Sequence, residues 1–126
     1  NGDARKASLA TLAKYLATQV TSVDDMITQY FAPSATGFTA TITDGPNSIW
    51  LVLTPTAGFA AGTIKLPTVS NCVDRQEVLI NTTQGVTTLT INGNGSTVTG
   101  APTTLAAGAY FKLRFDGVTD TWYRVG

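Results

Sequence analysis

The stretch at residues 111–126, FKLRFDGVTDTWYRVG, gives the most direct indication of the fold. Apolar and cationic residues alternate over residues 111–115, so one face of an extended segment is apolar and the other is charged. Asp116 and Gly117 then begin a turn, and residues 121–125 form a second run rich in strand-forming residues. The stretch therefore predicts a C-terminal β-hairpin whose first strand turns Phe111, Leu113 and Phe115 toward the core.

Further short runs of Thr, Val, Ile and Leu precede this hairpin at spacings of roughly ten residues. They cover residues 38–43, 48–54, 63–66, 77–82, 86–91 and 97–99. Residues 44–47 (DGPN) and 92–96 (NGNGS) are typical turn sequences. The pattern predicts a mainly β protein in which residues 33–126 form an antiparallel β-sandwich or barrel-like domain of about seven to eight strands.

The run at residues 49–53, IWLVL, differs from the others because it is apolar on both faces. A strand of this composition is typically covered on both sides. One cover is the domain itself, and the other is a helix or a neighbouring subunit. We therefore include Trp50 in a predicted oligomer interface.

Residues 4–31 contain neither Gly nor Pro and place apolar residues three and four apart. This spacing predicts an amphipathic helix, or two helices if Thr21 and Ser22 begin a second one. The heptad positions a and d, assigned to an oligomer interface, are Leu9, Leu12, Leu16, Gln19, Val23, Met26 and Tyr30. Two arrangements fit: a helix packed on its own domain, or a parallel trimeric coiled coil in which residues 1–32 serve oligomerisation or attachment, with Gln19 setting the register.

Composition restricts the partners. Eight Lys and Arg residues balance eight Asp and Glu residues, so no net charge attracts the chain to nucleic acid or to an anionic membrane. No run of 18 or more apolar residues is present, which predicts no membrane insertion. At 126 residues the chain is long enough for one domain with a modest core.

The residue types needed for most catalysis are scarce. There is no histidine and only one cysteine, Cys72, so histidine-based nucleophilic catalysis and a histidine-bound zinc are excluded. Asp44, Asp116 and Asp120 lie in predicted turns, where a short carboxylate accepts backbone hydrogen bonds. We expect no enzyme activity, no metal and no cofactor.

Aromatic residues allow a different function. Trp122 and Tyr123 could stack on the apolar face of a sugar ring, and Trp50 and Tyr110 could extend such a platform. The alternative is that these aromatic residues pack in the core, which is the commoner role of aromatic residues on strands. Both alternatives remain open for Trp122 and Tyr123 at the level of sequence.

Residues 64–126 resemble the repeated C-terminal pattern of bacteriophage virion appendage proteins, which include tail fibres, head fibres and capsid decoration proteins. The matching segments are Leu66-Pro67, Gln76-Glu77, Thr90-Ile91, residues 95–98, residues 105–108, residues 114–117 and residues 122–124. The N-terminal phrase DARKASLATLAKYLA is similar to the one that often precedes such modules.

This resemblance implies a non-enzymatic structural protein on the exterior of the capsid or tail of a phage virion. The implied assembly is a homotrimeric fibre or decoration knob that contacts other virion proteins. Two alternatives remain: a carbohydrate-binding module at a fibre tip that recognises a host surface glycan, and a small polysaccharide-degrading enzyme that uses carboxylates.

Overall fold

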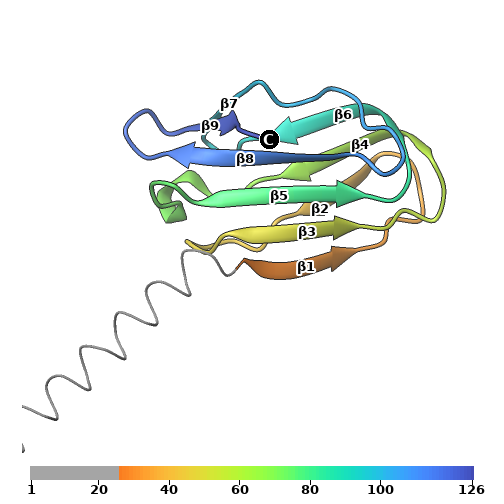
Figure 1. Cartoon of the computed structure of the whole chain (residues 1–126), viewed down its shortest axis with the longest axis horizontal. Coiled ribbons are helices and arrows are strands. Elements are labelled where there is room, and N and C mark those ends of the chain that lie inside the picture. Colours follow the sequence, from red (N-terminus) through yellow and green to blue (C-terminus); the bar gives the residue numbers. More distant parts are fainter. Residues whose placement is uncertain (1–25) are drawn as a thin grey trace, which may run out of the picture.

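The chain passes repeatedly between two β-sheets. The computed structural model describes residues 26–126. Its elements are β1 (Ile27–Phe31), β2 (Phe38–Thr41), β3 (Ile49–Leu53), β4 (Phe59–Lys65), the 3-10 helix η1 (Val69–Asn71), β5 (Glu77–Thr82), β6 (Val86–Asn92), β7 (Thr97–Thr99), β8 (Tyr110–Asp116) and β9 (Thr121–Arg124). Sheet A has the order β1-β3-β5-β8-β9-β7 and sheet B the order β2-β4-β6 (Figure 1). The prediction of a mainly β protein is confirmed for this part of the chain.

The first six strands form a parallel coil. Odd-numbered strands lie in sheet A and even-numbered strands in sheet B, so β1–β2, β3–β4 and β5–β6 are three successive turns of the coil. The strands β1, β3 and β5 pair in parallel, as do β2, β4 and β6. The predicted antiparallel sandwich or barrel is therefore wrong for these six strands. Each connection carries the chain to the opposite sheet, so neighbours within a sheet come from successive turns and run in the same direction.

The last strands extend and close sheet A. Strand β8 pairs antiparallel with β5, and β9 pairs antiparallel with β8, which confirms the predicted C-terminal hairpin. Strand β7 pairs in parallel with β9 at the edge of the sheet. Phe111, Leu113 and Phe115 are all buried, as the alternation of residues 111–115 predicts.

The helix predicted over residues 4–31 is wrong for its last five residues, because Ile27–Phe31 is strand β1. These residues pair with β3, and Ile27 N–H donates a hydrogen bond to the carbonyl oxygen of Ser48 (3.0 Å). Their β-branched and aromatic side chains suit a strand, and pairing with β3 decides between two locally compatible structures. The predicted heptad residues Leu9, Leu12, Leu16, Gln19 and Val23 lie outside the described residues. Met26 immediately precedes β1, in which Tyr30 lies.

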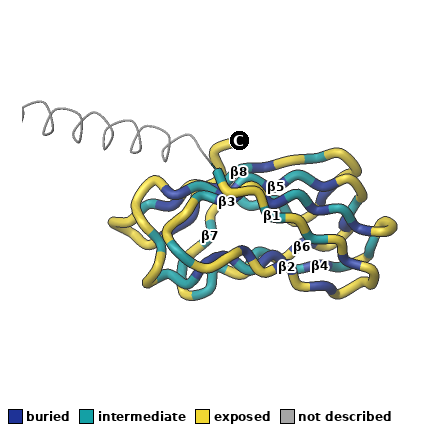
Figure 2. The backbone as a smooth tube through the Cα atoms, turned by 90° about the horizontal axis from the view of Figure 1, so that it is seen from below, coloured by how far each residue is buried: buried dark blue, intermediate teal, exposed yellow. Residues whose placement is uncertain are grey.

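The core fills the space between the two sheets (Figure 2). Phe38, at the start of β2, is buried, and its ring lies between those of Phe31 and Phe59, with centroids 6.1 and 6.2 Å away. Gly62 on β4 is the register partner of Phe38, and a Cβ atom at Gly62 would overlap the Phe38 ring. The missing side chain at Gly62 therefore makes room for an aromatic ring in the neighbouring turn of the coil.

Gln29 links the two sheets in the first turn of the coil. Its side-chain Nε2 donates to the carbonyl oxygen of Thr41 (2.7 Å). Its Oε1 accepts from the backbone N–H of Thr43 (2.9 Å) and from the Thr43 hydroxyl (3.1 Å). Gln29 aligns with the buried Leu51 of β3, so it occupies a position on the core side of β1. The side-chain amide of Gln29 thus satisfies backbone groups at the end of β2 and just after it, and links them to β1.

Candidate functional site

Large apolar side chains lie on the outer surface of sheet A. Side chains alternate along a strand, so Trp50 and Val52 of β3 point away from the core. The register aligns Trp50 with Leu79, and Val52 with Tyr30. Tyr30, Tyr110 and Trp50 are 74%, 61% and 39% exposed. We call these five residues, Tyr30, Trp50, Val52, Leu79 and Tyr110, the sheet A apolar face.

The outer surface of sheet B is chemically different. Thr39, Thr63 and Thr90 align with one another across β2, β4 and β6. Their hydroxyl and methyl groups suit a solvent-facing strand. The two outer surfaces of the coil therefore have different chemistry, and the exposed aromatic side chains of Tyr30, Trp50 and Tyr110 lie on only one of them.

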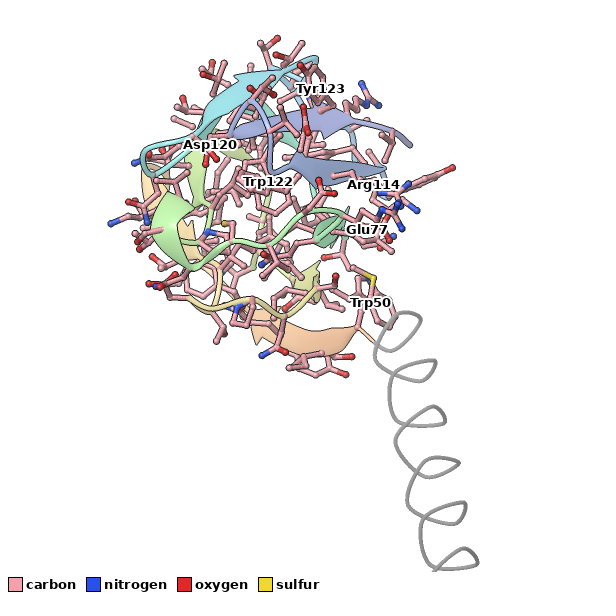
Figure 3. All side chains as sticks on the ribbon, turned by 90° about the vertical axis from the view of Figure 1, so that its left-hand side faces the viewer. Trp50, Glu77, Arg114, Asp120, Trp122 and Tyr123 are labelled. Carbon is pink, nitrogen blue, oxygen red and sulfur yellow. The ribbon has the colours of Figure 1, made fainter. Side chains whose placement is uncertain are left out.

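Polar contacts order the sheet A apolar face. Trp50 Nε1 donates to Asn81 Oδ1 (2.8 Å), which fixes the indole against the neighbouring strand. Lys112 Nζ lies 3.4 Å from Glu77 Oε2 at the side of this face. Trp50, Glu77 and Arg114 lie on the same side of the molecule in Figure 3. A shallow pocket of about 430 Å³ adjoins them and is lined by Leu79, Asn81, Tyr110, Lys112, Val125 and Gly126.

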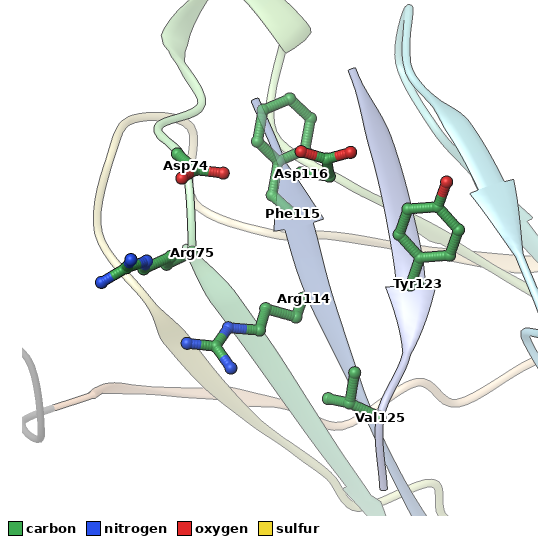
Figure 4. Close-up of a pocket in the computed structure, with 7 residues that line it drawn as sticks. All are labelled: Asp74, Arg75, Arg114, Phe115, Asp116, Tyr123 and Val125. Atoms are coloured by element: carbon green, nitrogen blue, oxygen red, sulfur yellow. The ribbon is translucent and has the colours of Figure 1, made fainter. Parts of the chain in front are cut away.

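A second concave region lies beside the C-terminal hairpin. It is a shallow, open cleft of about 460 Å³. Its lining residues come from the η1–β5 connection, from β8 and from β9 with the residue that follows it. They are Asp74, Arg75, Arg114, Phe115, Asp116, Tyr123 and Val125 (Figure 4). We call this region the hairpin cleft.

Two hydrogen bonds hold the η1–β5 connection against the hairpin. Arg75 N–H donates to the carbonyl oxygen of Phe115 (2.8 Å), and Gly117 N–H donates to Asp74 Oδ1 (2.9 Å). Arg75 has a φ of 70°, in the left-handed region that is uncommon for a residue with a Cβ atom. These contacts fix the position from which the Arg75 side chain enters the hairpin cleft.

The carboxylate of Asp116 accepts hydrogen bonds from the turn that follows β8. The Thr119 hydroxyl donates to Asp116 Oδ2 (2.7 Å), and Val118 N–H donates to Asp116 Oδ1 (3.1 Å). The hydrogen bond from the Thr119 side chain, followed by that from the Val118 backbone, lowers the pKa of Asp116 below its usual value of 3.8. Asp116 is therefore ionised at neutral pH and stabilises its own turn.

Within residues 26–126, neither arginine of the hairpin cleft forms an ion pair with a carboxylate. Within residues 26–126 the structure has a single ion pair, which joins Lys112 to Glu77. The guanidinium groups of Arg75 and Arg114 lie on the same side of the cleft in Figure 4. Arg114 is the direct register partner of Tyr123 across β8 and β9, and Tyr123 is 41% exposed. The two guanidinium groups lie on one side of the cleft, and the phenol ring of Tyr123 lies on the other side (Figure 4).

The structure separates the predicted site residues. Trp122 is fully buried, at 0% exposure, so the expectation that it contacts a glycan is corrected. Successive side chains of a strand point to opposite faces, so the burial of Trp122 leaves its neighbour Tyr123 at the surface. Trp50 and Tyr30 lie on adjacent strands of the sheet A apolar face. The sequence contains no local signal for Arg75, whose position depends on a hydrogen bond to Phe115.

Residues 26–126 contain little that could serve redox, nucleophilic or metal chemistry. Burial, followed by the negative charges of Asp44 and Asp120, raises the pKa of the Cys72 thiol to about 11. That thiol is therefore protonated at neutral pH. The same residues include no group of three or more His, Cys, Asp or Glu side chains arranged to hold a metal ion. Nor do they include a helix of the length and apolarity that a membrane crossing requires.

Comparison with known proteins gives no match: no family model, no curated protein and no solved structure is similar to the chain.

Proposed function

We propose that this chain is a non-enzymatic structural module of a bacteriophage virion appendage, and that it self-associates as a homotrimer. The observation that carries this proposal is the sheet A apolar face, which includes the exposed side chains of Tyr30, Trp50 and Tyr110. A second copy of the chain is the partner that the composition favours, since a chain without net charge has no long-range repulsion between its copies.

The contrast between the two outer surfaces supports self-association on one side. In a cyclic homotrimer each subunit buries two different patches, which adjoin on the side facing the three-fold axis, and the remaining surface stays in water. The sheet A apolar face has the composition of a buried patch, because aromatic residues are enriched at interface cores. The row of Thr39, Thr63 and Thr90 on sheet B suits the solvent-exposed side.

The assignment to a phage appendage depends on the sequence pattern of residues 64–126. Its matching segments fall on described elements: residues 95–98 form the turn into β7, and residues 114–117 and 122–124 belong to the β8–β9 hairpin. In this proposal the module lies on the exterior of the capsid or tail and contacts other virion proteins. Its function is mechanical.

The test is the mass of the full chain in solution. We expect sedimentation equilibrium at micromolar concentration to give a mass close to three times 13.2 kDa. Trp50→Lys places a charge on the sheet A apolar face and shifts the mass toward that of the monomer. The matched control Thr63→Lys places the same charge on the outer surface of sheet B and leaves the mass unchanged. A monomeric wild-type chain would refute the proposal.

The predicted heptad needs a separate variant, because it offers a second route to a trimer. Leu12→Lys disrupts a heptad position without changing the sheet A apolar face. If Leu12→Lys dissociates the trimer and Trp50→Lys does not, the heptad and not sheet A holds the subunits together. Circular dichroism of each variant checks that the β-sheets are retained.

We propose glycan binding as a second role, which the position of Tyr123 favours. Its ring is partly exposed on the wall of the hairpin cleft, next to charged side chains that can bind sugar hydroxyls. The test is binding of the full chain to a glycan array, compared with Tyr123→Ala. Loss of binding in this variant supports the role, and unchanged binding contradicts it.

A further inference from the structure

The two arginines in the hairpin cleft come from segments far apart in the sequence and meet at one place. Arg75 lies in the η1–β5 connection and Arg114 in β8, and both line the same cleft of about 460 Å³. Neither belongs to the single ion pair of residues 26–126. A guanidinium group presents several N–H donors in a plane, which matches the two oxygens of a carboxylate or phosphate. Two such groups on one side of a cleft favour an anion.

The backbone of Arg75 provides an independent reason to assign a function to its side chain. A φ of 70° is unfavourable for a residue with a Cβ atom, and glycine would adopt it freely. Within residues 26–126, the other residues that have a positive φ and are not glycine are Asn94 and Asp120. Asparagine and aspartate tolerate this conformation. Arginine has no such tolerance. Residues held in unfavourable conformations are concentrated at functional sites.

The carboxylates near the two arginines have other partners. Glu77, the register partner of Arg114 on β5, pairs with Lys112. Both oxygens of Asp116 accept hydrogen bonds from the turn that follows β8. Asp74 Oδ1 accepts from Gly117 N–H, whereas its Oδ2 accepts no hydrogen bond within the described residues. The carboxylates of Asp74 and Asp116 lie in the upper part of the view in Figure 4, and both guanidinium groups lie below them. The cleft therefore has a cationic end and an acidic end.

We propose that the hairpin cleft binds a saccharide that carries an anionic group, either a carboxylate or a phosphate. The guanidinium groups of Arg75 and Arg114 bind the anionic group. The phenol ring of Tyr123 packs against the sugar ring, and Asp74 Oδ2 accepts a hydrogen bond from a sugar hydroxyl. This inference rests on the second proposed role, glycan binding.

The experiment titrates the full-length chain, labelled with ¹⁵N, and follows backbone amide shifts by NMR. Four probes separate the parts of the ligand: D-glucuronate, glucose 6-phosphate, methyl glucoside and inorganic phosphate. We expect at least one of the two acidic sugars to shift the amides of residues 74, 75, 114 and 123. We expect methyl glucoside and inorganic phosphate each to bind at least about tenfold more weakly than the acidic sugar. Methyl glucoside lacks the anionic group, and inorganic phosphate lacks the sugar ring.

Variants identify the groups responsible. Arg114→Gln and Arg75→Gly should each weaken binding of the acidic sugar by about tenfold or more, the effect of losing a charge-assisted hydrogen bond. The control Arg124→Gln removes one positive charge outside the cleft lining and should leave affinity within about twofold, because strand alternation turns Arg124 to the opposite side of β9 from Tyr123. An equal loss in Arg124→Gln would show a general charge effect and overturn the proposal.

The remaining outcomes distinguish failure of this inference from failure of glycan binding. Equal affinity for methyl glucoside and D-glucuronate at the cleft would overturn the requirement for an anion and retain glycan binding. Inorganic phosphate that binds as tightly as both acidic sugars would show a simple anion site and overturn the role of the sugar. If no sugar shifts the cleft amides and the glycan array is also negative, both proposals fail, and the mass of the assembly remains a separate test of self-association.

Discussion

Phe115 and Trp122 are direct partners across the β8–β9 hairpin, and their ring centroids lie 5.2 Å apart with an interplanar angle of 56°. Both side chains are buried. A tilted aromatic pair at this separation is favourable beyond the area that it buries. The pair attaches the closing hairpin to the core of the parallel coil and thereby fixes one wall of the hairpin cleft.

Phe115→Ala should lower the free energy of unfolding by about 3 to 5 kcal/mol, because it removes a buried ring and leaves a cavity beside Trp122. Urea unfolding followed by circular dichroism measures the change. The control Val118→Ala alters a residue that is 90% exposed in the same hairpin turn, and it should change stability by less than about 0.5 kcal/mol. A loss below about 1 kcal/mol in Phe115→Ala would contradict its placement in the core.

Gly62→Ala should also destabilise the protein, although it adds only one methyl group. The new Cβ atom overlaps the ring of Phe38, and the rings of Phe31 and Phe59 restrict the movement of Phe38. Overpacking of this kind costs about 1 to 3 kcal/mol. The same unfolding experiment measures it.

Gly58→Ala is the matched control for the effect of Gly62→Ala. A Cβ atom at Gly58 makes only an ordinary contact, 3.7 Å from the carbonyl oxygen of Gly85. We expect Gly58→Ala to be neutral or slightly stabilising, since alanine restricts the unfolded chain. Equal stability of Gly58→Ala and Gly62→Ala would show that β2 and β4 are not in the described register.

The sequence predicted where most strands lie but not how they pair. Alternation in residues 111–115 and the turn at Asp116 concern neighbours in sequence, so the closing hairpin was predictable. The pairing of β3 with β1 and β5 joins residues more than 20 positions apart, for example Ile49 with Ile27 and with Val78. Apolar alternation is the same for parallel and antiparallel partners, so it could not distinguish a coil from a sandwich.

The site was predictable only in part, for a similar reason. Trp50 stood out because its strand is apolar on both faces, and the structure places it on an exposed face. Trp122 and Tyr123 are adjacent, and the sequence does not specify which of them points inward. The entry of Arg75 into the hairpin cleft depends on a hydrogen bond to Phe115, 40 residues away, which leaves no local signal.

Lowering the pH should destabilise the protein through Asp44. The Thr68 hydroxyl and the Thr68 backbone N–H each donate to its carboxylate at 2.8 Å, and they lower the pKa of Asp44 below its usual value of 3.8. A carboxyl group whose pKa is lower in the folded state than in the unfolded state stabilises the fold when both are ionised. That contribution is lost as the pH falls through the folded-state pKa.

We therefore expect the urea midpoint of the wild-type chain to fall between about pH 5 and pH 3. Asp44→Asn cannot be protonated in this range, so its midpoint should be lower at pH 7 and should depend less on pH. The control Asp120→Asn changes a carboxylate that accepts no hydrogen bond within residues 26–126, and it should keep the wild-type pH dependence. An unchanged pH dependence in Asp44→Asn would contradict the role of the Thr68 hydrogen bonds.

Arg75→Gly and Arg75→Ala separate the cost of the backbone conformation from the function of the side chain. Both variants remove the guanidinium, but only glycine adopts a φ of 70° without steric cost. After allowance for the greater freedom of glycine in the unfolded chain, Arg75→Gly should be about 1 kcal/mol more stable than Arg75→Ala in urea unfolding. Equal or greater stability of the alanine variant would mean that the position is unstrained, and arginine at this position would then need no functional explanation.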